Sequence, residues 1–412
     1  MKIAFIVGEF PVLSETFILN QITGLLDRGH EVDIYAYVPK NDSKIHPDVN
    51  KYKLIERTYY AFWMPINRYK RALDSLVLLL TNFHKAPLVM LRVLNIFKYR
   101  QQYGSLMLIH EVIPFLRKRS PYDIIHCHFG GNGLKGALFR EMGAIKGKLI
   151  VTFHGLDITV AIQGDSKQIY DQLFNTGDLF LPISERWKRR LVDLGCDKTK
   201  IIVHRMGIDC GKFSFIPRKL HADGRVQLVT ISRLVEKKGV EYGIRAVALL
   251  AKTNRNIKYN VIGDGPLRKD LQELIQHLDV GDIVSLLGWK QQQEIVDILN
   301  DADIFVAPSV TSKDGDQEGI PVAVMEAMAV GLPIISTQHS AIPELVENGV
   351  SGFLVPEGDV NALAEKLGYL IEHPEVWTEM GRAGRAHVEA QYDINKLNDQ
   401  LVEIYQKLLI QA

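Results

Sequence analysis

Short apolar runs that each end in a glycine or a polar loop recur along this chain, and helical patterns separate them. The first run is residues 3–7, an apolar helix face follows at 18–26, and a second run occupies 31–38. A strand–helix–strand order of this kind opens a doubly wound parallel sheet. We therefore predict an α/β fold in which ligands bind at the carboxyl ends of the strands.

The loop after the first run, from Gly8 to Thr16, is accordingly a candidate contact, with Ser14 as the expected cap of the following helix. The loop has no G-x-G-x-x-G pattern, which argues against a nicotinamide cofactor.

The same pattern restarts at residues 226–231, so the chain divides into two halves. Its 412 residues are enough for two or three domains with separate cores. We predict a Rossmann-like domain over residues 1–207, a second over 208–387, and a C-terminal helix over 388–412 that crosses back to the first domain. The other expected strands are residues 124–128, 149–153, 179–183, 201–203, 259–262, 284–287, 304–307, 333–336 and 352–355.

Charge and cysteine content narrow the class of protein. A formal net charge of +1 excludes a nucleic-acid footprint over the whole molecule. Three cysteines, widely spaced, indicate a reducing compartment and provide neither a disulfide framework nor a zinc knuckle. The chain runs from its first residues straight into a strand pattern, and no apolar run reaches membrane-spanning length. We expect a cytoplasmic protein.

Residues 51–119 differ from the rest of the chain. They hold thirteen basic residues against three acidic ones, interleaved with aromatic residues and the apolar run 76–80. Basic helices with large apolar faces bind anionic membrane surfaces. The alternative is a helical insertion that packs on the sheet and exposes its basic side to water. Nucleic-acid binding has less support, because no recognised motif accompanies the charge.

Histidines mark two of the predicted strand ends. His126 and His128 point the same way on a strand, and we interpret them as structural or site-lining residues because no third metal ligand follows at a suitable spacing. His154 and Asp157 directly follow the strand at 149–153, where this architecture places its chemistry. A simple turn is the competing interpretation for that segment.

Two carboxylates flank the start of a helix predicted over residues 321–330. Glu318 precedes this helix, Glu326 lies within it, and Gly331 follows it as a stop signal. Eight residues correspond to about 12 Å along a helix axis, roughly the length of a sugar-diphosphate-ribose skeleton. The helix start between them offers backbone N–H groups and a positive dipole end to an anion. Two isolated carboxylates are more often a loop residue and a wet helix face, so this hypothesis depends on the neighbouring motifs.

Cationic side chains follow the first strand of the second half. Arg233 can bind phosphate oxygens bidentately, and Lys238 supplies a mobile charge, although such a loop is often only a surface turn. Gly265, after the strand at 259–262, would let the backbone approach a flat ligand such as a base. All these candidates follow predicted strand ends, which predicts one shared cleft.

Taken together, these motifs resemble those of family 4 glycosyltransferases, which have the two-Rossmann GT-B architecture. The resemblance spans nearly the whole chain and is strongest over residues 226–358. The motifs that carry it are Ser-Arg-Leu-Val-Glu-Lys-Lys-Gly, Gly-Asp-Gly-Pro, Leu-Gly-Trp, Ala-Pro-Ser and the Glu-x7-Glu of Glu318 and Glu326. Where the family usually has Gly-Gly after its first strand, this chain has Gly-Glu-Phe-Pro. With the long basic insertion, that departure resembles the exopolysaccharide and colanic-acid-type branch.

The resemblance implies an acceptor-side first domain and a second domain that binds a nucleotide sugar, facing each other across a cleft. It implies that Arg233 and Lys238 hold the donor diphosphate, while Glu318 binds sugar hydroxyls at the reacting end. His154 would touch the sugar near its 6-hydroxyl, and Glu326 would bind the ribose hydroxyls. The expected donor site also includes Gly265, Gly319, Ile320, Pro321 and Val322, and the acceptor-side candidates are Gly8, Glu15, Thr16 and Asp157.

The family retains anomeric configuration and uses no metal or cofactor, so positioning and charge stabilisation would supply most of the rate. We predict a hexosyltransferase that uses a UDP- or GDP-sugar and a lipid-linked or growing polysaccharide acceptor. The basic insertion would dock it peripherally on the inner face of the plasma membrane, with no nucleic-acid partner. The alternatives are a soluble transferase making a small glycoside, a non-catalytic sugar-nucleotide-binding subunit, and an isomerase on a similar two-domain fold.

Overall fold

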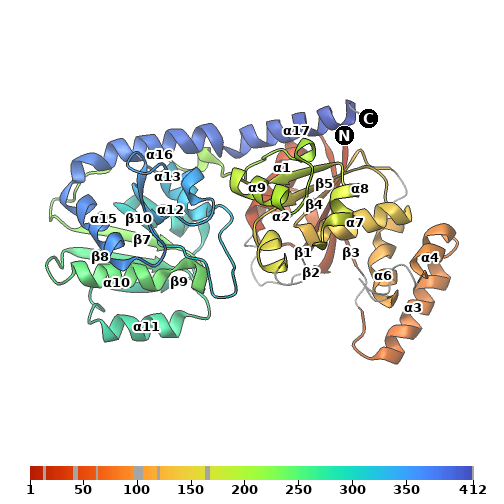
Figure 1. Cartoon of the computed structure of the whole chain (residues 1–412), viewed down its shortest axis with the longest axis horizontal. Helices are drawn as coiled ribbons and strands as arrows, with labels where there is room; N and C mark the ends of the chain where they lie inside the picture. The colour runs from red at the N-terminus through yellow and green to blue at the C-terminus, as the bar shows by residue number, and fades with distance from the viewer. Residues whose placement is uncertain are drawn as a thin grey trace.

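The computed structural model describes residues 1–12, 15–39, 45–61, 64–95, 105–117, 121–162 and 168–410, and it contains two lobes, each built on a parallel six-stranded sheet (Figure 1). The first sheet has the strand order β3-β2-β1-β4-β5-β6, and the second has β12-β11-β10-β7-β8-β9. Counted from its own first strand, each sheet follows the Rossmann order 3-2-1-4-5-6. The prediction of two doubly wound α/β domains is confirmed.

The first sheet is buried on both faces. Along β1, Ile3, Phe5 and Val7 pack with α1 and the C-terminal helix α17, whereas Ala4 and Ile6 pack on the opposite face, which α7 covers. Its strands are β1 (Lys2–Phe10), β2 (Glu31–Pro39), β3 (Thr58–Tyr60), β4 (Ile124–His128), β5 (Lys148–Phe153) and β6 (Leu179–Pro182). The helices of this lobe are α1 (Thr16–Asp27), α2 (Pro47–Lys51), α3 (Arg68–Asn82), α4 (Pro87–Val93), α6 (Ser105–Val112), α7 (Gly130–Met142), α8 (Asp171–Thr176) and α9 (Glu185–Asp193).

The second sheet also lies between helical layers. Its strands are β7 (Val226–Ile231), β8 (Ile257–Ile262), β9 (Val284–Gly288), β10 (Ile304–Ala307), β11 (Ile334–Thr337) and β12 (Gly352–Val355). The helices that accompany it are α10 (Val240–Leu250), α11 (Arg268–His277), α12 (Gln292–Asp301), α13 (Val322–Ala329), α14 (Ile342–Leu345), α15 (Val360–Glu372) and α16 (Trp377–Gln391). No helix in the ranges given above is both long enough and apolar enough to cross a membrane.

Three predicted elements of the first lobe differ from the structure. β1 continues through Gly8 to Phe10, because the first residue that cannot donate a backbone hydrogen bond is Pro11. Residues 201–203 do not form a strand; Ile201 makes a single bridge to Phe180. The basic segment 51–119 is not purely a helical insertion, since it supplies the edge strand β3. The predicted cap Ser14 lies outside the described residues.

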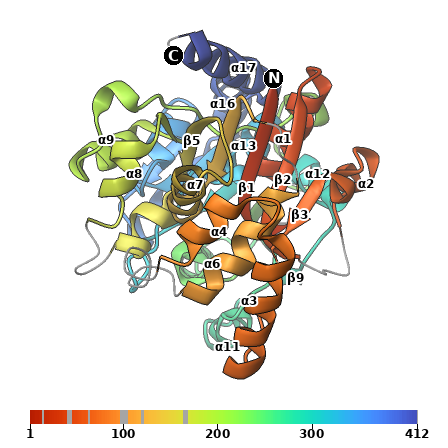
Figure 2. The same cartoon turned by 90° about the vertical axis from the view of Figure 1, so that its right-hand side faces the viewer.

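The helices of the basic segment lie at the far end of the first lobe. Figure 1 shows α3 and α4 on the side away from the second sheet, and Figure 2 shows α3 projecting beyond the other elements. α3 packs on α6, where Ser75 Oγ and His110 Nε2 share a hydrogen bond of 3.2 Å.

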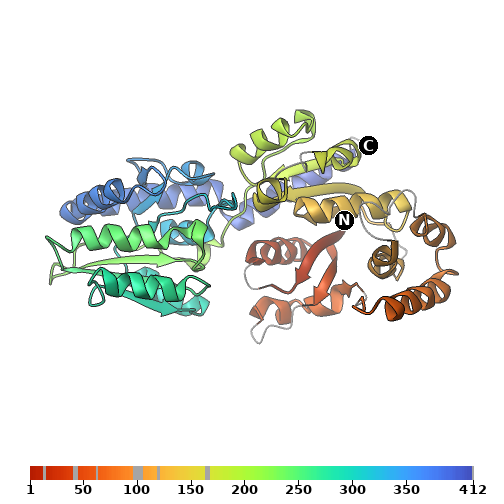
Figure 3. The ribbon, with the colours of Figure 1, turned by 60° about the horizontal axis from the view of Figure 1, so that its bottom comes forward.

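The C-terminal tail returns to the first lobe (Figure 3). It is not one helix from 388, because the chain breaks between α16 and α17 (Ile394–Ile410) at Tyr392. There Ile208 donates its N–H to the Tyr392 carbonyl and accepts from the Ile394 N–H, both at 2.9 Å. A Cβ on Gly207 would lie 2.2 Å from the Tyr392 oxygen, so only glycine fits this approach. The chain passes between the lobes at Ile208 and again between α16 and α17, and these hydrogen bonds join the two connections.

α17 is part of the first lobe's core. It packs on α1, where Arg28 and Asp399 form an ion pair of 2.7 Å, and Leu401 is fully buried. Tyr405 reaches the sheet, and its hydroxyl shares a hydrogen bond of 2.5 Å with His126 Nδ1.

A second contact between the lobes involves Glu344 of α14. Its carboxylate accepts from the backbone N–H groups of Glu185 (2.9 Å) and Arg186 (2.8 Å) at the start of α9. A carboxylate stabilises a helix N-terminus because it satisfies open N–H groups and faces the positive end of the dipole. One lobe therefore caps a helix of the other.

Candidate active site

A cleft of about 630 Å³ lies between the lobes, at the carboxyl ends of the strands. From the first lobe it is lined by Glu15, Phe17, Phe129, His154, Leu156 and Met206. From the second lobe the lining includes the ends of β7, β8 and β10, the segment 317–324 and Glu326. Ligands bind at this position in open α/β sheets, where the strand order reverses.

The cationic side of the cleft follows β7. Arg233 is exposed and lines the cleft, and Lys238 closes the short 3₁₀ turn Glu236–Lys238. The next residue, Gly239, has φ +60°, and a Cβ there would lie 1.9 Å from the Pro308 carbonyl oxygen. The turn that aims Lys238 into the cleft therefore requires glycine.

Lys238 and Glu318 meet directly. Lys238 Nζ lies 2.7 Å from Glu318 Oε1, and the carboxylate is only 6% exposed. Burial acts to raise the pKa of Glu318, but the charges of Lys238 and Lys237 outweigh it and hold the pKa below its usual value. Glu318 is thus an ionised acceptor inside the cleft.

The helix behind Glu318 matches the predicted one to within a residue at each end. Pro321 directly precedes α13, Val322 begins it, and Gly331, with φ +91°, follows it. The first turn of α13 comes from residues that line the cleft. The Val324 N–H donates to the Pro321 carbonyl at 3.1 Å, and the amides that precede it are those that a helix start generally leaves open to a ligand. Ile320 is buried beneath them.

Gly319 is placed by the opposite lobe. A Cβ there would lie 2.7 Å from the His154 carbonyl oxygen, so a larger residue would push the lobes apart. Glycine at this position therefore allows the two lobes to pack closely against each other.

Glu326 lies one turn into α13 and is half-buried. Burial raises its pKa to about 7, although a hydrogen bond of 3.4 Å from Gln292 Nε2 acts in the opposite direction. A carboxyl group in this state gains stabilisation from any hydroxyl donors that a ligand brings.

His154 forms the floor of the cleft on the first lobe. Its ring packs on Phe17 and Phe129 at centroid distances of 4.7 and 4.5 Å, and Nε2 shares a hydrogen bond of 3.0 Å with His128 Nδ1. Burial lowers the pKa of His154 to about 3, with a smaller effect of His126, so the imidazole is neutral. A neutral ring offers a hydrogen bond without a charge.

His126 is structural, since Tyr405 and Thr152 occupy its Nδ1 and Nε2 at 2.5 and 2.7 Å. Both of its ring nitrogens are therefore hydrogen-bonded to elements that pack on β4, one to α17 and the other to β5.

Four predicted site positions, Gly8, Thr16, Asp157 and Gly265, are not among the described residues that line the cleft, whereas Glu15 is. Gly8 lies within β1, and Thr16 begins α1. A Cβ on Gly265 would lie 2.5 Å from the Leu234 carbonyl oxygen, so this glycine serves the packing of two loops.

Asp157 is buried under the loop after β5. Its carboxylate accepts from the backbone N–H groups of Gly130, His154 and Gly155 at 2.9 to 3.0 Å. Burial nevertheless raises its pKa to about 6. The predicted acceptor-side residue thus orders the loop that carries His154.

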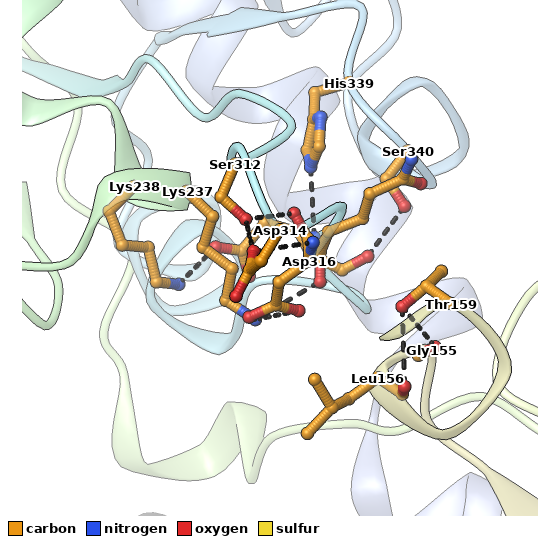
Figure 4. Close-up of polar contacts among 12 residues, drawn as sticks. Gly155, Leu156, Thr159, Lys237, Lys238, Ser312, Asp314, Asp316, His339 and Ser340 are labelled. Atoms are coloured by element: carbon orange, nitrogen blue, oxygen red, sulfur yellow. Dashed lines mark hydrogen bonds and ion pairs between the residues drawn. The ribbon is translucent and has the colours of Figure 1, made fainter. Parts of the chain in front are cut away.

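Three residues near Glu318 were not among the predicted site residues. Lys237 lines the cleft and forms an ion pair of 2.9 Å with Asp316. The only sequence signal for Lys237 was its position next to Lys238. His339 and Ser340 approach the same loop from the other side (Figure 4). No local pattern indicates their role, because it depends on contacts between distant segments.

Two Rossmann-order sheets around a cleft with cations, carboxylates and a helix start define the GT-B class of glycosyltransferases. The chain is similar to the Anabaena Alr3699/HepE structure in complex with UDP and glucose, with a TM-score of 0.73 and 18% identity over 99% of this chain and all of that one. It is also similar to sucrose-phosphate synthase from Thermosynechococcus elongatus, with a TM-score of 0.70, 20% identity and full coverage of both chains. At these identities the likeness shows the fold.

Sequence comparison shows the family. The profile for Glycosyltransferase Family 4 matches residues 14–212, and that for Glycosyl transferases group 1 matches residues 212–387. The amylovoran biosynthesis glycosyltransferase AmsK of Erwinia amylovora is 39% identical over 99% of this chain and all of the relative. The putative colanic acid biosynthesis glycosyltransferase WcaL of Salmonella typhimurium is 38% identical at the same coverage. The chain belongs to glycosyltransferase family 4 and is a glycosyltransferase of the exopolysaccharide biosynthesis type.

Proposed function

We propose that this enzyme moves a hexose from a UDP- or GDP-sugar to a lipid-linked or growing polysaccharide, with retained anomeric configuration and without a metal ion. The observation that carries the proposal is the cleft, which brings Arg233, Lys238, Glu318 and Glu326 together with the start of α13. Cations and helix amides suit a diphosphate, and carboxylates suit the hydroxyls at its two ends.

In this proposal Arg233 and Lys238 neutralise the diphosphate as it leaves. Lys238 forms an ion pair with Glu318, and a bound phosphate would share the ammonium. Glu318 would then accept hydrogen bonds from the sugar, and the neutral His154 would contact another sugar hydroxyl. The departing phosphate would guide the acceptor to the same face of the sugar. Such preorganised charges act without reorganisation at the moment of reaction.

The comparisons support a nucleotide-sugar donor and a polysaccharide acceptor. The similar Anabaena structure was solved with UDP and glucose, and two relatives that match over 99% of this chain are described by their polysaccharides, amylovoran and colanic acid. We therefore place a nucleoside diphosphate sugar in the cleft and a saccharide acceptor on the side of the first lobe.

A panel of uridine, guanosine and adenosine diphosphate sugars in a thermal-shift assay would identify the donor, because a ligand of the folded state raises the melting temperature. Donor turnover should then fall by roughly a hundredfold in Glu318→Ala. Glu365→Ala, at an exposed acid of α15, is the matched control. Turnover should persist in EDTA. A donor that binds without turnover in the wild type would instead support a non-catalytic subunit.

We further propose that α3 docks the enzyme on an anionic membrane surface. Tyr69, Leu73, Leu76 and Leu80 are 51 to 90% exposed and follow the spacing i, i+4, i+7, i+11, so they form one apolar stripe. Exposed basic residues of the same region (Arg68, Lys70, Lys85 and Arg92) would meet anionic headgroups, at about 1 kcal/mol for each cation near the surface.

Vesicle flotation tests the docking. Wild-type protein should float with vesicles that contain anionic lipid, and the triple variant Leu73→Ser/Leu76→Ser/Leu80→Ser should remain at the bottom of the gradient. Leu220→Ser, at an exposed leucine of the second lobe, is the control and should float. Equal behaviour of all three proteins would favour an insertion that merely exposes its basic side to water.

A further inference from the structure

The loop that carries Glu318 is held from behind by two consecutive residues between β11 and α14. His339 Nε2 lies 3.0 Å from the Glu318 backbone nitrogen, and Ser340 Oγ lies 2.6 Å from the Glu318 carbonyl oxygen. Figure 4 shows both side chains directed at this loop. Both backbone groups of Glu318, the N–H donor and the carbonyl acceptor, are therefore hydrogen-bonded to this pair of residues.

The first of these contacts fixes which ring nitrogen of His339 accepts a hydrogen bond. A backbone nitrogen can only donate, so Nε2 must be the unprotonated acceptor. The ring proton then lies on Nδ1 and is donated to Glu357 Oε1 at 2.7 Å. The other Glu357 oxygen accepts from the Thr311 N–H at 2.6 Å. A chain of hydrogen bonds therefore links the Thr311 amide, through Glu357 and His339, to the Glu318 amide.

The carboxylate beside His339 fits this arrangement. Burial acts to raise the pKa of Glu357, but the hydrogen bonds from Thr311 and His339 hold it below its usual value. The His339 ring itself is fully buried. Ser340 has φ +49°, in the left-handed region that non-glycine residues rarely adopt. A strained residue whose hydroxyl contacts the active-site loop indicates that its conformation serves that contact.

We propose that His339 and Ser340 are positioning residues for the reaction, which hold the Glu318 peptide so that its carboxylate meets the donor sugar. The inference rests on the sugar-binding role proposed for Glu318. Its side chain pairs with Lys238, which a separate turn after β7 carries, so a shift of the Glu318 peptide would move the carboxylate and leave the lysine in place. A displacement of about 1 Å at a reacting centre can cost roughly a hundredfold in rate.

Two amide substitutions separate the two hydrogen bonds of His339. His339→Gln places an oxygen near the position of Nε2 and can still accept from Glu318. His339→Asn places a donor near Nδ1 and still reaches Glu357, but it falls short of Glu318. We expect kcat within about threefold of the wild type in His339→Gln and at least roughly tenfold lower in His339→Asn. The Kd for the nucleoside diphosphate without its sugar should stay the same in both.

Amide hydrogen exchange tests the hydrogen bond between His339 and the Glu318 amide without requiring turnover. The peptide that contains the Glu318 amide should exchange faster in His339→Asn and at the wild-type rate in His339→Gln. If His339→Asn does not fold, Ser340→Ala provides the second variant, with kcat several-fold lower and an unchanged Kd for the nucleoside diphosphate. Equal kcat and equal exchange in the Gln and Asn variants would overturn the inference. Absence of turnover in the wild type with every donor would instead overturn the proposed function, and the exchange comparison would still decide whether His339 holds Glu318.

Discussion

Donor binding should weaken as the pH falls through 7, because Glu326 takes up a proton. With a pKa of about 7, this carboxyl is roughly 90% ionised one pH unit above that value and roughly 10% ionised one unit below it. Ribose hydroxyls donate to the ionised form, so a bound donor favours loss of the proton. The apparent Kd should therefore rise about tenfold over those two units as the pH is lowered.

Isothermal titration calorimetry with a nucleoside diphosphate sugar measures this effect. The sugar ester is the correct probe, because the terminal phosphate of a free nucleoside diphosphate would itself titrate in the same range. Titrations near the midpoint in buffers of different ionisation enthalpy should reveal about half a proton released for each donor bound.

Glu326→Gln is the matched control, since it keeps the size of the side chain and its contact with Gln292 but cannot titrate. Its donor affinity should be independent of pH over the same range. The assignment of Glu326 to the ribose is refuted if the variant and the wild type show the same pH dependence, or if the wild type shows none.

Three further substitutions test other parts of the structure. Gly319→Val should reduce turnover at least roughly tenfold and enlarge the radius of gyration measured by X-ray scattering, because its side chain would strike the His154 carbonyl of the other lobe. Glu344→Ala should lower the free energy of unfolding measured in urea by about 1 to 2 kcal/mol, since it removes the carboxylate that caps α9. Tyr405→Phe should cost about 1 to 3 kcal/mol in the same assay, because it leaves Nδ1 of the buried His126 unpaired. Wild-type turnover or wild-type unfolding midpoints would contradict the respective argument.

The sheets were largely predictable because a parallel strand that is buried on both faces must be a continuous apolar run. β7 and β10 accordingly match their predicted bounds. β3 was missed because its three residues are half-buried at a sheet edge and form no apolar run. The break at Tyr392 was missed because the apolar periodicity continues across it, while the cause is a contact with Ile208.

The position of the cleft was predictable from the strand order, but the direction of individual side chains was not. Asp157 follows a strand end as predicted, yet it turns inward because three backbone N–H groups need an acceptor there. His339 was missed for the converse reason. It lies 21 residues from Glu318 in the chain, and only the folded loops bring them together.

The return of α17 to the first lobe has a consequence for how the protein is made. His126 leaves the ribosome 279 residues before Tyr405, its hydrogen-bond partner. At a synthesis rate of about 5 to 20 residues per second, His126 waits roughly 15 to 55 s for the helix that packs on α1 and reaches β4 inside the sheet. A C-terminal truncation would therefore damage the lobe that is translated first.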